Sequence, residues 1–404
     1  MIPRERIIAA LKHKEPDRIP VDIGGTESSG IMAVTYNRLK KHLGISGRTQ
    51  VFDMMQMITK VEPTVLEIVG ADVIPLLIEP KQWKPWVLSD GSEVEIPAKI
   101  NLRKLDNGDI EQISENGTVI CRCPKDGLYF DPVFHPLEKS ITLEDIDAAK
   151  PYFQSTDWPG YLDEDFEDLR AKAQKLYTET DYAIVGNLYV HLFAAAQSLR
   201  GFEDFMMDLV ANKPFAHYIL EKQVEAYLPR IDKYIEAVGP YVQIIQVNDD
   251  LGAQNAPQLS PQLYREMIKP YHKTLWQNIK QKSKKALLLH SCGSIYDLIP
   301  DLIEIGIDAL NPVQVSAAKM DTKKLKKEFG KDITFWGGGC DTQNVLPYGS
   351  PDDVKEEVRR RVNDLAPGGG FVFCQVHNIQ ADVPVENIRA MYEELGTLGH
   401  NTKL

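Results

Sequence analysis

The chain has 404 residues, of which 43% are hydrophobic and 26% charged, and its formal net charge is −12. This composition is ordinary for a globular protein, and the length suits one large domain with an insertion or two domains. The acidic balance argues against nucleic acid as a partner. No apolar run approaches the roughly 18 residues that a membrane-spanning helix needs, so we expect no membrane association.

The opening segment is charged and is not typical of a secretory signal. The five cysteines are mostly far apart in the sequence, which argues against a disulfide framework and for a reducing compartment. We therefore expect a cytoplasmic protein.

Short apolar runs with β-branched residues recur along the chain and alternate with helical patterns. The eight expected strands are residues 18–25, 71–77, 182–189, 242–250, 286–292, 309–314, 333–339 and 370–377. Such alternation is typical of an α/β protein in which helices cover a parallel sheet. Eight units favour a closed (β/α)8 barrel, or TIM barrel, and an open doubly wound sheet is the alternative.

Helical patterns separate most of these strands. The expected helices are residues 4–13, 202–238, 260–281, 294–306, 322–330 and 350–365. Pro214 predicts that the segment 202–238 is two helices. We expect the first helix, 4–13, to pack on the outside of the barrel.

Residues 80–155 interrupt this alternation of strands and helices. They hold DG and NG pairs between alternating runs, which are strong signals of β-hairpins. We interpret this stretch as an antiparallel β insertion after the second strand. The chain is then a single TIM-barrel domain over residues 1–404, with the barrel in 18–79 and 156–404.

The carboxyl ends of barrel strands usually carry the active site, and a possible metal site lies there. His290 and Cys292 are two residues apart on the fifth strand, so their side chains face the same side. Cys340 follows the seventh strand at the same end. One imidazole and two thiolates suit Zn²⁺ with a fourth position left open. The plain alternative is that the cysteines are core residues.

Other polar residues at these strand ends are candidates for catalysis or substrate binding. Asp249, Asp250 and His377 are candidate acid–base groups. Alternatively, the aspartates are a turn or a helix cap, and His377 is structural. The candidate substrate-binding residues are Glu27, Asn187, Tyr189 and Gln314.

Four segments resemble the uroporphyrinogen decarboxylase superfamily. They are RERIIAALKHKEPDRIPVD, NDDLGAQNAPQLSPQLYREMIKPYHKTL, LLHSCGSIYDLIPDLIEIGIDALNPVQ and GGGFVFCQVHNIQADVPVENI. The resemblance covers most of the chain outside the insertion. Decarboxylases of the superfamily carry an arginine-rich RQAGRY-like segment after the first strand and need no metal. This chain has GGTESSGIM there, so the tetrapyrrole-binding arginine is missing.

The cobalamin-dependent methyltransferase branch carries an H-x-C motif and a later cysteine as zinc ligands. These positions match His290, Cys292 and Cys340. In the coenzyme M enzymes of that branch we expect an acidic residue after the sixth strand, where this chain has Gln314. The chain is more similar to the zinc-containing substrate:corrinoid-protein methyltransferases of O-demethylase systems, which act on methoxylated aromatics.

The resemblance implies transfer of a methyl group from a small methoxylated substrate, an aryl methyl ether, to the cob(I)alamin of a corrinoid protein. Zinc on the ether oxygen would stabilise the developing phenolate. The chain lacks the D-x-H-x-x-G pattern that binds cobalamin, so a partner protein is expected to supply the corrinoid. The alternatives are a methylcobalamin:thiol methyltransferase similar to the coenzyme M enzymes, a metal-free decarboxylase and a non-catalytic ligand-binding barrel.

Overall fold

A parallel sheet forms the centre of the protein in the computed structural model, which describes residues 1–125, 127, 129–140, 142–154 and 165–399. Its order is β15-β14-β13-β12-β11-β10-β3, so neighbours in the sheet follow one another in the chain. The strands are β3 (Val73–Leu76), β10 (Ala183–Asn187), β11 (Ile244–Asn248), β12 (Ala286–His290), β13 (Ala309–Asn311), β14 (Thr334–Trp336) and β15 (Phe371–Val372). Each lies within a strand expected from the sequence, which confirms the α/β barrel fold.

Residues 20–22 connect the two edges of this sheet. On one side the Phe373 N–H donates to the Pro20 carbonyl, and the Asp22 N–H donates to the Phe373 carbonyl, both at 2.8 Å. On the other side the Asp72 N–H, just before β3, donates to the Val21 carbonyl at 2.8 Å. This segment therefore takes the place of the eighth strand and curls the sheet into a barrel.

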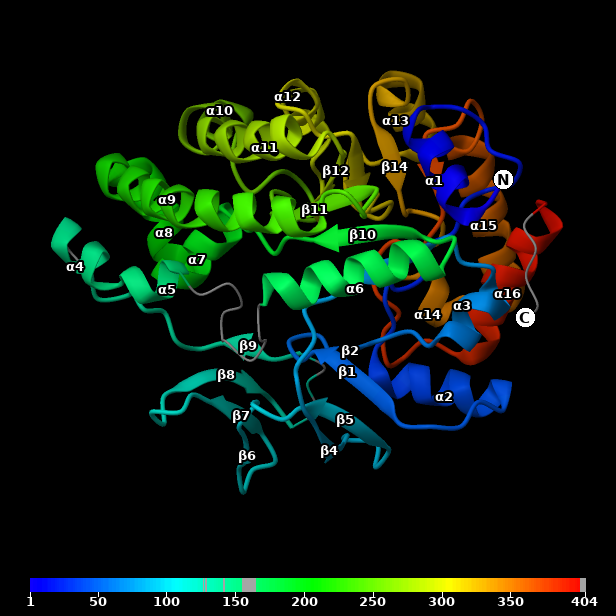
Figure 1. The fold of residues 1–404 in the computed structure, drawn as a ribbon, viewed down its shortest axis with the longest axis horizontal. Helices are drawn as coiled ribbons and strands as arrows, with labels where there is room; N and C mark the ends of the chain where they lie inside the picture. Colours follow the sequence, from blue (N-terminus) through cyan, green and yellow to red (C-terminus); the bar gives the residue numbers. More distant parts are fainter. Residues whose placement is uncertain (126, 128, 141, 155–164, 400–404) are drawn as a thin grey trace.

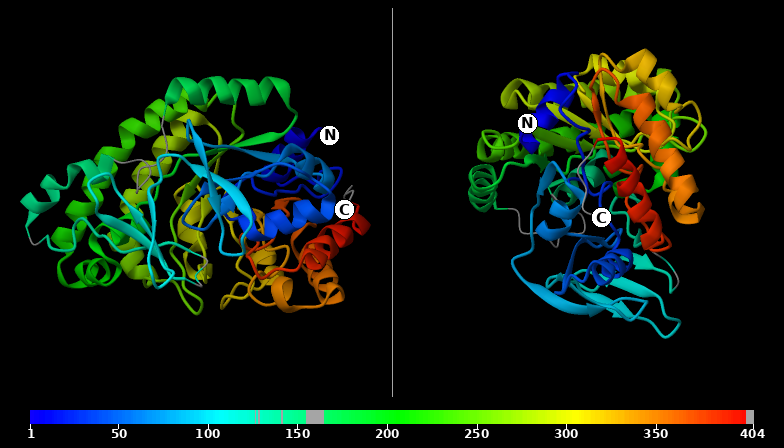
Figure 2. Two further views of the ribbon diagram at one scale, coloured as in Figure 1. Left: turned by 90° about the horizontal axis from the view of Figure 1, so that it is seen from below. Right: turned by 90° about the vertical axis from the view of Figure 1, so that its right-hand side faces the viewer.

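Helices surround the barrel (Figures 1 and 2). They include α3 (Pro63–Val69), α6 (Phe166–Glu179), α8 (Phe202–Ala211), α9 (Lys213–Val238), α10 (Pro261–Met267), α11 (Lys269–Ser283), α12 (Ile299–Glu304), α13 (Thr322–Phe329), α14 (Val345–Tyr348), α15 (Pro351–Leu365) and α16 (Val385–Thr397). The break predicted near Pro214 is confirmed, since α9 starts there with a proline in its first turn. Residues 260–281 are also two helices, because Pro270 cannot continue the ladder of α10.

The first helix, α1 (Pro3–Leu11), closes the amino-terminal end of the barrel. Its Ile7 and Ala10 are fully buried in one hydrophobic cluster with alternate residues of the barrel strands. That cluster includes Val73, Ala183, Val185, Ile244, Leu288, Ala309, Trp336 and Val372. The prediction that this helix packs outside the barrel is therefore wrong, because its apolar stripe covers side chains that point into the barrel.

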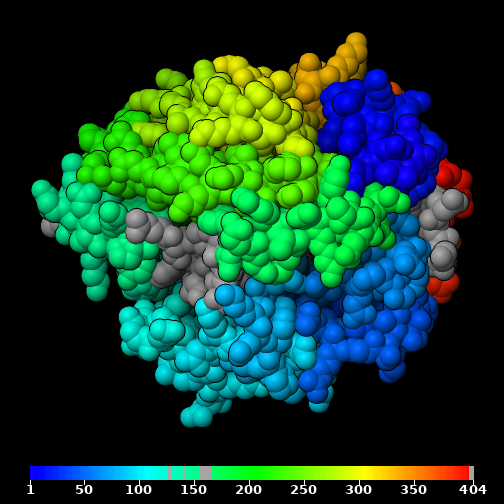
Figure 3. All heavy atoms as spheres, in the orientation of Figure 1, coloured from blue at the N-terminus to red at the C-terminus, as the bar shows by residue number. Residues whose placement is uncertain are grey.

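The insertion forms two small sheets beside the barrel (Figure 1), and its cyan residues lie along the lower side of the molecule in Figure 3. One has the order β2-β1-β5-β4 and the other the antiparallel order β6-β7-β8-β9. The strands are β1 (Thr49–Asp53), β2 (Ile58–Thr59), β4 (Trp83–Val87), β5 (Glu93–Pro97), β6 (Leu102–Lys104), β7 (Ile110–Ile113), β8 (Val119–Cys123) and β9 (Asp131–Pro132). Two of them, β1 and β2, precede the second barrel strand and were not expected. β1 pairs with β5 in parallel, so the chain before β3 completes the insertion.

The remaining helices are α2 (Ala33–Leu43), α4 (Leu143–Ala148), α5 (Lys150–Gln154), α7 (Phe193–Arg200) and the short η1 (Tyr296–Leu298). Within the described residues, no helix combines the length and the apolar character that crossing a membrane requires.

Candidate metal and substrate site

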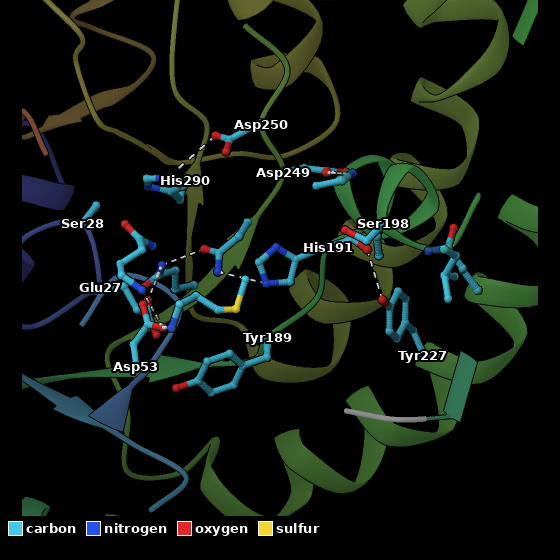
Figure 4. Close-up of a pocket in the computed structure, with 18 of the residues that line it drawn as sticks. Glu27, Ser28, Asp53, Tyr189, His191, Ser198, Tyr227, Asp249, Asp250 and His290 are labelled. Atoms are coloured by element: carbon cyan, nitrogen blue, oxygen red, sulfur yellow. Dashed lines mark hydrogen bonds and ion pairs between the residues drawn. The ribbon is translucent and has the colours of Figure 1, made fainter. Parts of the chain in front are cut away.

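A cavity of about 360 Å³ lies at the carboxyl ends of the barrel strands. Its walls come from the loop after the first strand, from the ends of β10 to β12, and from α7 and α9. The insertion contributes Phe52 and Asp53 of β1, together with the loop that follows them. Figure 4 shows His290 and Asp250 on one side of this cavity and Ser198 and Tyr227 on the other.

Three possible metal ligands meet at one side of the cavity. They are His290, Cys292 and His377, whose donor atoms all lie within 4.8 Å of one another. The Nε2 atom of His290 lies 3.5 Å from the Sγ atom of Cys292, as the two-residue spacing at the end of β12 predicts. Two imidazoles and one thiolate are donors that zinc prefers, and three protein ligands leave a position open for a substrate.

Asn311 fixes the orientation of the His290 ring. Its Oδ1 atom lies 2.8 Å from His290 Nδ1, while its Nδ2 group donates to the Trp336 carbonyl at 3.1 Å. Because that second bond orients the amide, Oδ1 must accept, so His290 carries its proton on Nδ1. The lone pair of Nε2 is then free to face Cys292, which is the arrangement of a metal-bound histidine and its supporting residue.

Burial sets the protonation of the other two candidate ligands. It lowers the pKa of His377 to about 4, with His290 as a further cause, so this imidazole is neutral at ordinary pH. It raises the pKa of the Cys292 thiol well above its usual range, and Asp250 adds to the rise. A thiol in this position binds a metal only by losing its proton, so metal binding and deprotonation are coupled.

Cys340 is not part of this group of three. It follows β14 and is fully buried, and its backbone carbonyl accepts from the Val376 N–H at 2.9 Å. The charged groups that act on its thiol are Glu357, Asp341 and Arg361, of which the first and last belong to α15 on the outside of the barrel. Its role as a zinc ligand stays a prediction, and the third residue of the described group is His377.

Asp249 holds the beginning of α7. Its carboxylate accepts the backbone N–H groups of Leu192, Phe193 and Ala194 at 2.7 to 3.1 Å. It also lies 2.7 Å from Nε2 of His272, and both side chains are buried. A carboxylate with both oxygens engaged in this way fits the helix-cap alternative for this residue, and its catalytic role stays a prediction.

Asp250 and Gln314 hold the loop that carries Cys292. The Oδ1 atom of Asp250 accepts the Cys292 N–H at 2.7 Å and lies 3.8 Å from His290 Nε2. The Oε1 atom of Gln314 accepts the N–H of the next residue, Gly293, at 2.7 Å. Asp250 lines the cavity and is half exposed, whereas Gln314 is not among the lining residues.

Glu27 and Tyr189 line the cavity (Figure 4), and Asn187 at the end of β10 contacts Glu27. The Nδ2 group of Asn187 donates to Glu27 Oε1 at 2.5 Å and fixes the carboxyl. Asn187 also accepts the Tyr189 N–H at 3.1 Å, and Tyr189 has a positive φ of 51°, which is uncommon outside glycine. Burial raises the pKa of Glu27 to about 7, and the nearby Asp53 adds to the rise. These three predicted residues therefore form one group.

Several residues of the site were not singled out from the sequence. Asn311 is detectable in principle, because it is the register partner of His290 across β12 and β13. Asp53, His191, Gln223 and Tyr227 also line the cavity, and they come from the insertion sheet, a loop and the long helix α9. His191 lies just beyond the expected strand 182–189, which is a local signal, but no local pattern marks Asp53, Gln223 and Tyr227, which only the tertiary fold brings to the barrel end.

Residues 139–397 match the sequence profile of the uroporphyrinogen decarboxylase (URO-D) family. The chain belongs to this family. It is 23% identical over 298 residues to a uroporphyrinogen decarboxylase from Hydrogenobaculum sp., an alignment that covers 69% of this chain and 81% of that protein.

Methyltransferases are also among the similar proteins. The chain is 24% identical over 190 residues to the methylcobamide:CoM methyltransferase MtaA of Methanosarcina barkeri, covering 46% of this chain and about half, 52%, of that enzyme. A methyltransferase from Methanosarcina mazei has the same fold, with a TM-score of 0.61 and 18% identity. That match covers 98% of this chain and 99% of the other. Its fold therefore extends over both the barrel and the insertion.

Proposed function

We propose that this protein is a zinc-dependent methyltransferase that moves a methyl group from an aryl methyl ether to the cob(I)alamin of a corrinoid protein. The observation that carries the proposal is the group His290, Cys292 and His377 at one side of a cavity large enough for a small substrate. The resemblance to methyltransferases within the family supports the reaction class.

The donor set fits a zinc ion. His290, Cys292 and His377 supply two nitrogens and a sulfur, and Asn311 holds the first imidazole with Nε2 unprotonated. When bound there, zinc would supply Lewis-acid stabilisation of the negative charge that develops on the leaving oxygen. A second candidate reaction is methyl transfer from methylcobalamin to a thiol. It would use the same three metal ligands, and the likeness to the coenzyme M enzyme favours it.

The reaction needs a proton as well as a methyl acceptor. The bond from the ether oxygen to the methyl carbon breaks, and the methyl carbon bonds to cobalt. The oxygen keeps the bonding electrons and takes up a proton. Glu27 lines the cavity and has a pKa raised to about 7, so it can hold a proton at neutral pH and donate it to the phenolate. Asp250, 3.8 Å from Nε2 of His290, stays an alternative candidate for the acid–base group.

The corrinoid must approach from outside the chain. We propose that a separate corrinoid protein docks over the open side of the cavity. Binding of the carrier protein would position the cobalt with a lower entropic cost than binding of free cofactor.

The test uses the full-length protein loaded with zinc, a methoxylated benzene and a reduced corrinoid protein. We expect the cob(I)alamin absorbance to convert to that of methylcobalamin while the phenol forms in equal amount. Phenol formation without any corrinoid would contradict the proposal and indicate hydrolysis. Methylation of a thiol by methylcobalamin, with no transfer from any ether, would favour the second reaction.

A further inference from the structure

The described lining of the cavity has several carboxyl groups but no lysine or arginine. Four carboxylates line it, namely Glu27, Asp53, Asp249 and Asp250. The described lining includes neither lysine nor arginine, and its other titratable groups are histidines and tyrosines. Proteins that bind carboxylates or sulfonates use arginine or lysine for this purpose. This lining offers an anionic substrate no such partner.

Two of these carboxylates are held by neutral donors. Glu27 accepts from the side chain of Asn187, and Asp53 accepts from the backbone N–H groups of Met55 and Gln56. Burial raises the pKa of both groups, to about 7 and about 6, so this part of the cavity disfavours negative charge. An anionic substituent placed beside them would carry the same desolvation cost without a basic partner to offset it.

The remaining lining of the cavity is aromatic and apolar. Phe52, Tyr152, Phe153 and Leu199 are among the residues that line it. Flat rings and a cavity of about 360 Å³ suit one small aromatic molecule, which would bind by stacking and by burial of apolar surface.

A buried amide lies at the side of the cavity formed by α7 and α9. Gln223 of α9 lines the cavity and is 1% exposed, and neither atom of its amide forms a hydrogen bond of ordinary length. Its side chain interacts with the hydroxyl of Tyr227, one helical turn further along α9, which lies across the cavity from His290 (Figure 4). A buried amide with no full hydrogen bond is costly, and a ligand with a neutral oxygen substituent would satisfy it.

We propose that the methyl donor is an uncharged aromatic methyl ether with a second oxygen substituent. Its methoxy group faces His290, Cys292 and His377, and its second oxygen forms a hydrogen bond with Gln223. Donors that carry a carboxylate or a sulfonate are disfavoured, because the described lining has no lysine or arginine to pair with them. A methylated ammonium group does not fit, because its nitrogen has no lone pair for a metal. This proposal rests on the proposed function in one respect, namely that the methoxy group faces the proposed zinc ligands.

Binding of three rings to the zinc-loaded full chain, without corrinoid, tests this proposal. Guaiacol has a methoxy and a hydroxyl group, vanillate adds a carboxylate, and anisole lacks the hydroxyl. By calorimetry we expect guaiacol to bind about tenfold or more tighter than vanillate, and several-fold tighter than anisole. Equal or tighter binding of vanillate would overturn the proposal, as would binding of none of the rings.

The variant Gln223→Leu tests whether the Gln223 amide binds the second oxygen of the ligand. We expect it to bind anisole as the wild type does but to lose the preference for guaiacol, whereas Gln197→Leu on α7 keeps that preference. Gln197 is the matched control, because its amide bonds to Gln258 and it does not line the cavity. An unchanged preference in a Gln223→Leu protein with normal melting would contradict the assignment. If this variant does not fold, the comparison of the three rings on the wild type still decides the charge preference.

These outcomes are distinct from failure of the proposed function. Methyl transfer from vanillate to a corrinoid protein, with tight vanillate binding, would leave the function standing and overturn this inference. Tight binding of guaiacol with no transfer to any corrinoid would overturn the function and leave the ligand preference intact.

Discussion

The Oδ1 atom of Asn311 lies 2.8 Å from the Nδ1 atom of His290, and the two residues face each other in the register of β12 and β13. The same oxygen accepts the hydroxyl of Ser28 at 2.5 Å. A residue that touches no substrate thus decides which nitrogen of His290 is available to a metal.

Replacing Asn311 with alanine should therefore weaken zinc binding. The His290 ring would lose the acceptor that fixes its proton on Nδ1, and losses of roughly ten- to a hundredfold in affinity are usual for such supporting residues. Competition with a chromogenic chelator measures the change. Ser28→Ala is the control, since it removes one bond to Asn311 and keeps the bond to His290. An unchanged zinc affinity in Asn311→Ala would show that the ring is held by other contacts.

Zinc content should distinguish the two candidates for the third ligand. We expect His377→Ala to lose bound zinc, because His377 is grouped with His290 and Cys292. With His377 as the third ligand, Cys340→Ser should retain zinc, because Cys340 is not in that group; with Cys340 as the third ligand, it should lose zinc. Metal analysis after dialysis gives the answer for both, with Cys374→Ser as a second buried-cysteine control. Zinc loss in Cys340→Ser alone would return that cysteine to the ligand set.

The two neighbouring aspartates should respond differently to replacement by asparagine. Asp249→Asn disturbs a buried carboxylate that holds His272 and the start of α7, so we expect a lower melting temperature, from a stability loss on the order of 2 kcal/mol. Asp250→Asn should melt normally and transfer methyl groups more slowly, since Asp250 is half exposed and lies beside His290. Thermal unfolding and turnover, measured on both variants, separate the roles. Normal melting of Asp249→Asn with lost turnover would assign catalysis to Asp249.

The carboxyl of Glu27 should make stability depend on pH. Its folded pKa of about 7 is raised above the ordinary value of 4.5, so the folded protein holds this proton more tightly than the unfolded chain. Stability then falls as pH rises from about 4.5 to about 7, and it stays lower above that range. We expect Glu27→Gln to gain melting temperature relative to the wild type between about pH 5 and pH 8. A constant difference across this range would show that the buried carboxyl does not titrate there.

The barrel strands were predictable because each is a near-continuous apolar run that must be covered on both faces. Ile244–Asn248, for instance, is buried at every position. The strand Thr49–Asp53 was missed because its sequence TQVFD is mostly polar and is not a continuous apolar run, and its partner β5 lies more than forty residues later in the chain. The place of α1 was predicted wrongly because an apolar stripe does not say which surface covers it.

The candidate site was predictable only where local geometry is simple. The spacing of His290 and Cys292 on one strand determines that both face one side, and these two residues are together. No such rule applies to Cys340, because Gly337 and Gly338 have positive φ angles of 96° and 81° and redirect the chain before it. The partners of Asp249 lie more than fifty residues earlier and more than twenty later, so its contacts could not be read from neighbouring residues.

The position of α1 also determines when it can be buried during synthesis. Its Ile7 and Ala10 pack against Trp336 and Val372, which the ribosome adds more than three hundred residues later. The surface that covers the apolar stripe of α1 is therefore completed only when nearly the whole chain has emerged, although its first residues, such as Val73 and Ala183, are made earlier. A nascent chain of this protein leaves part of this apolar helix exposed for most of its synthesis, and chains that stop before Val372 lack part of the surface that covers it.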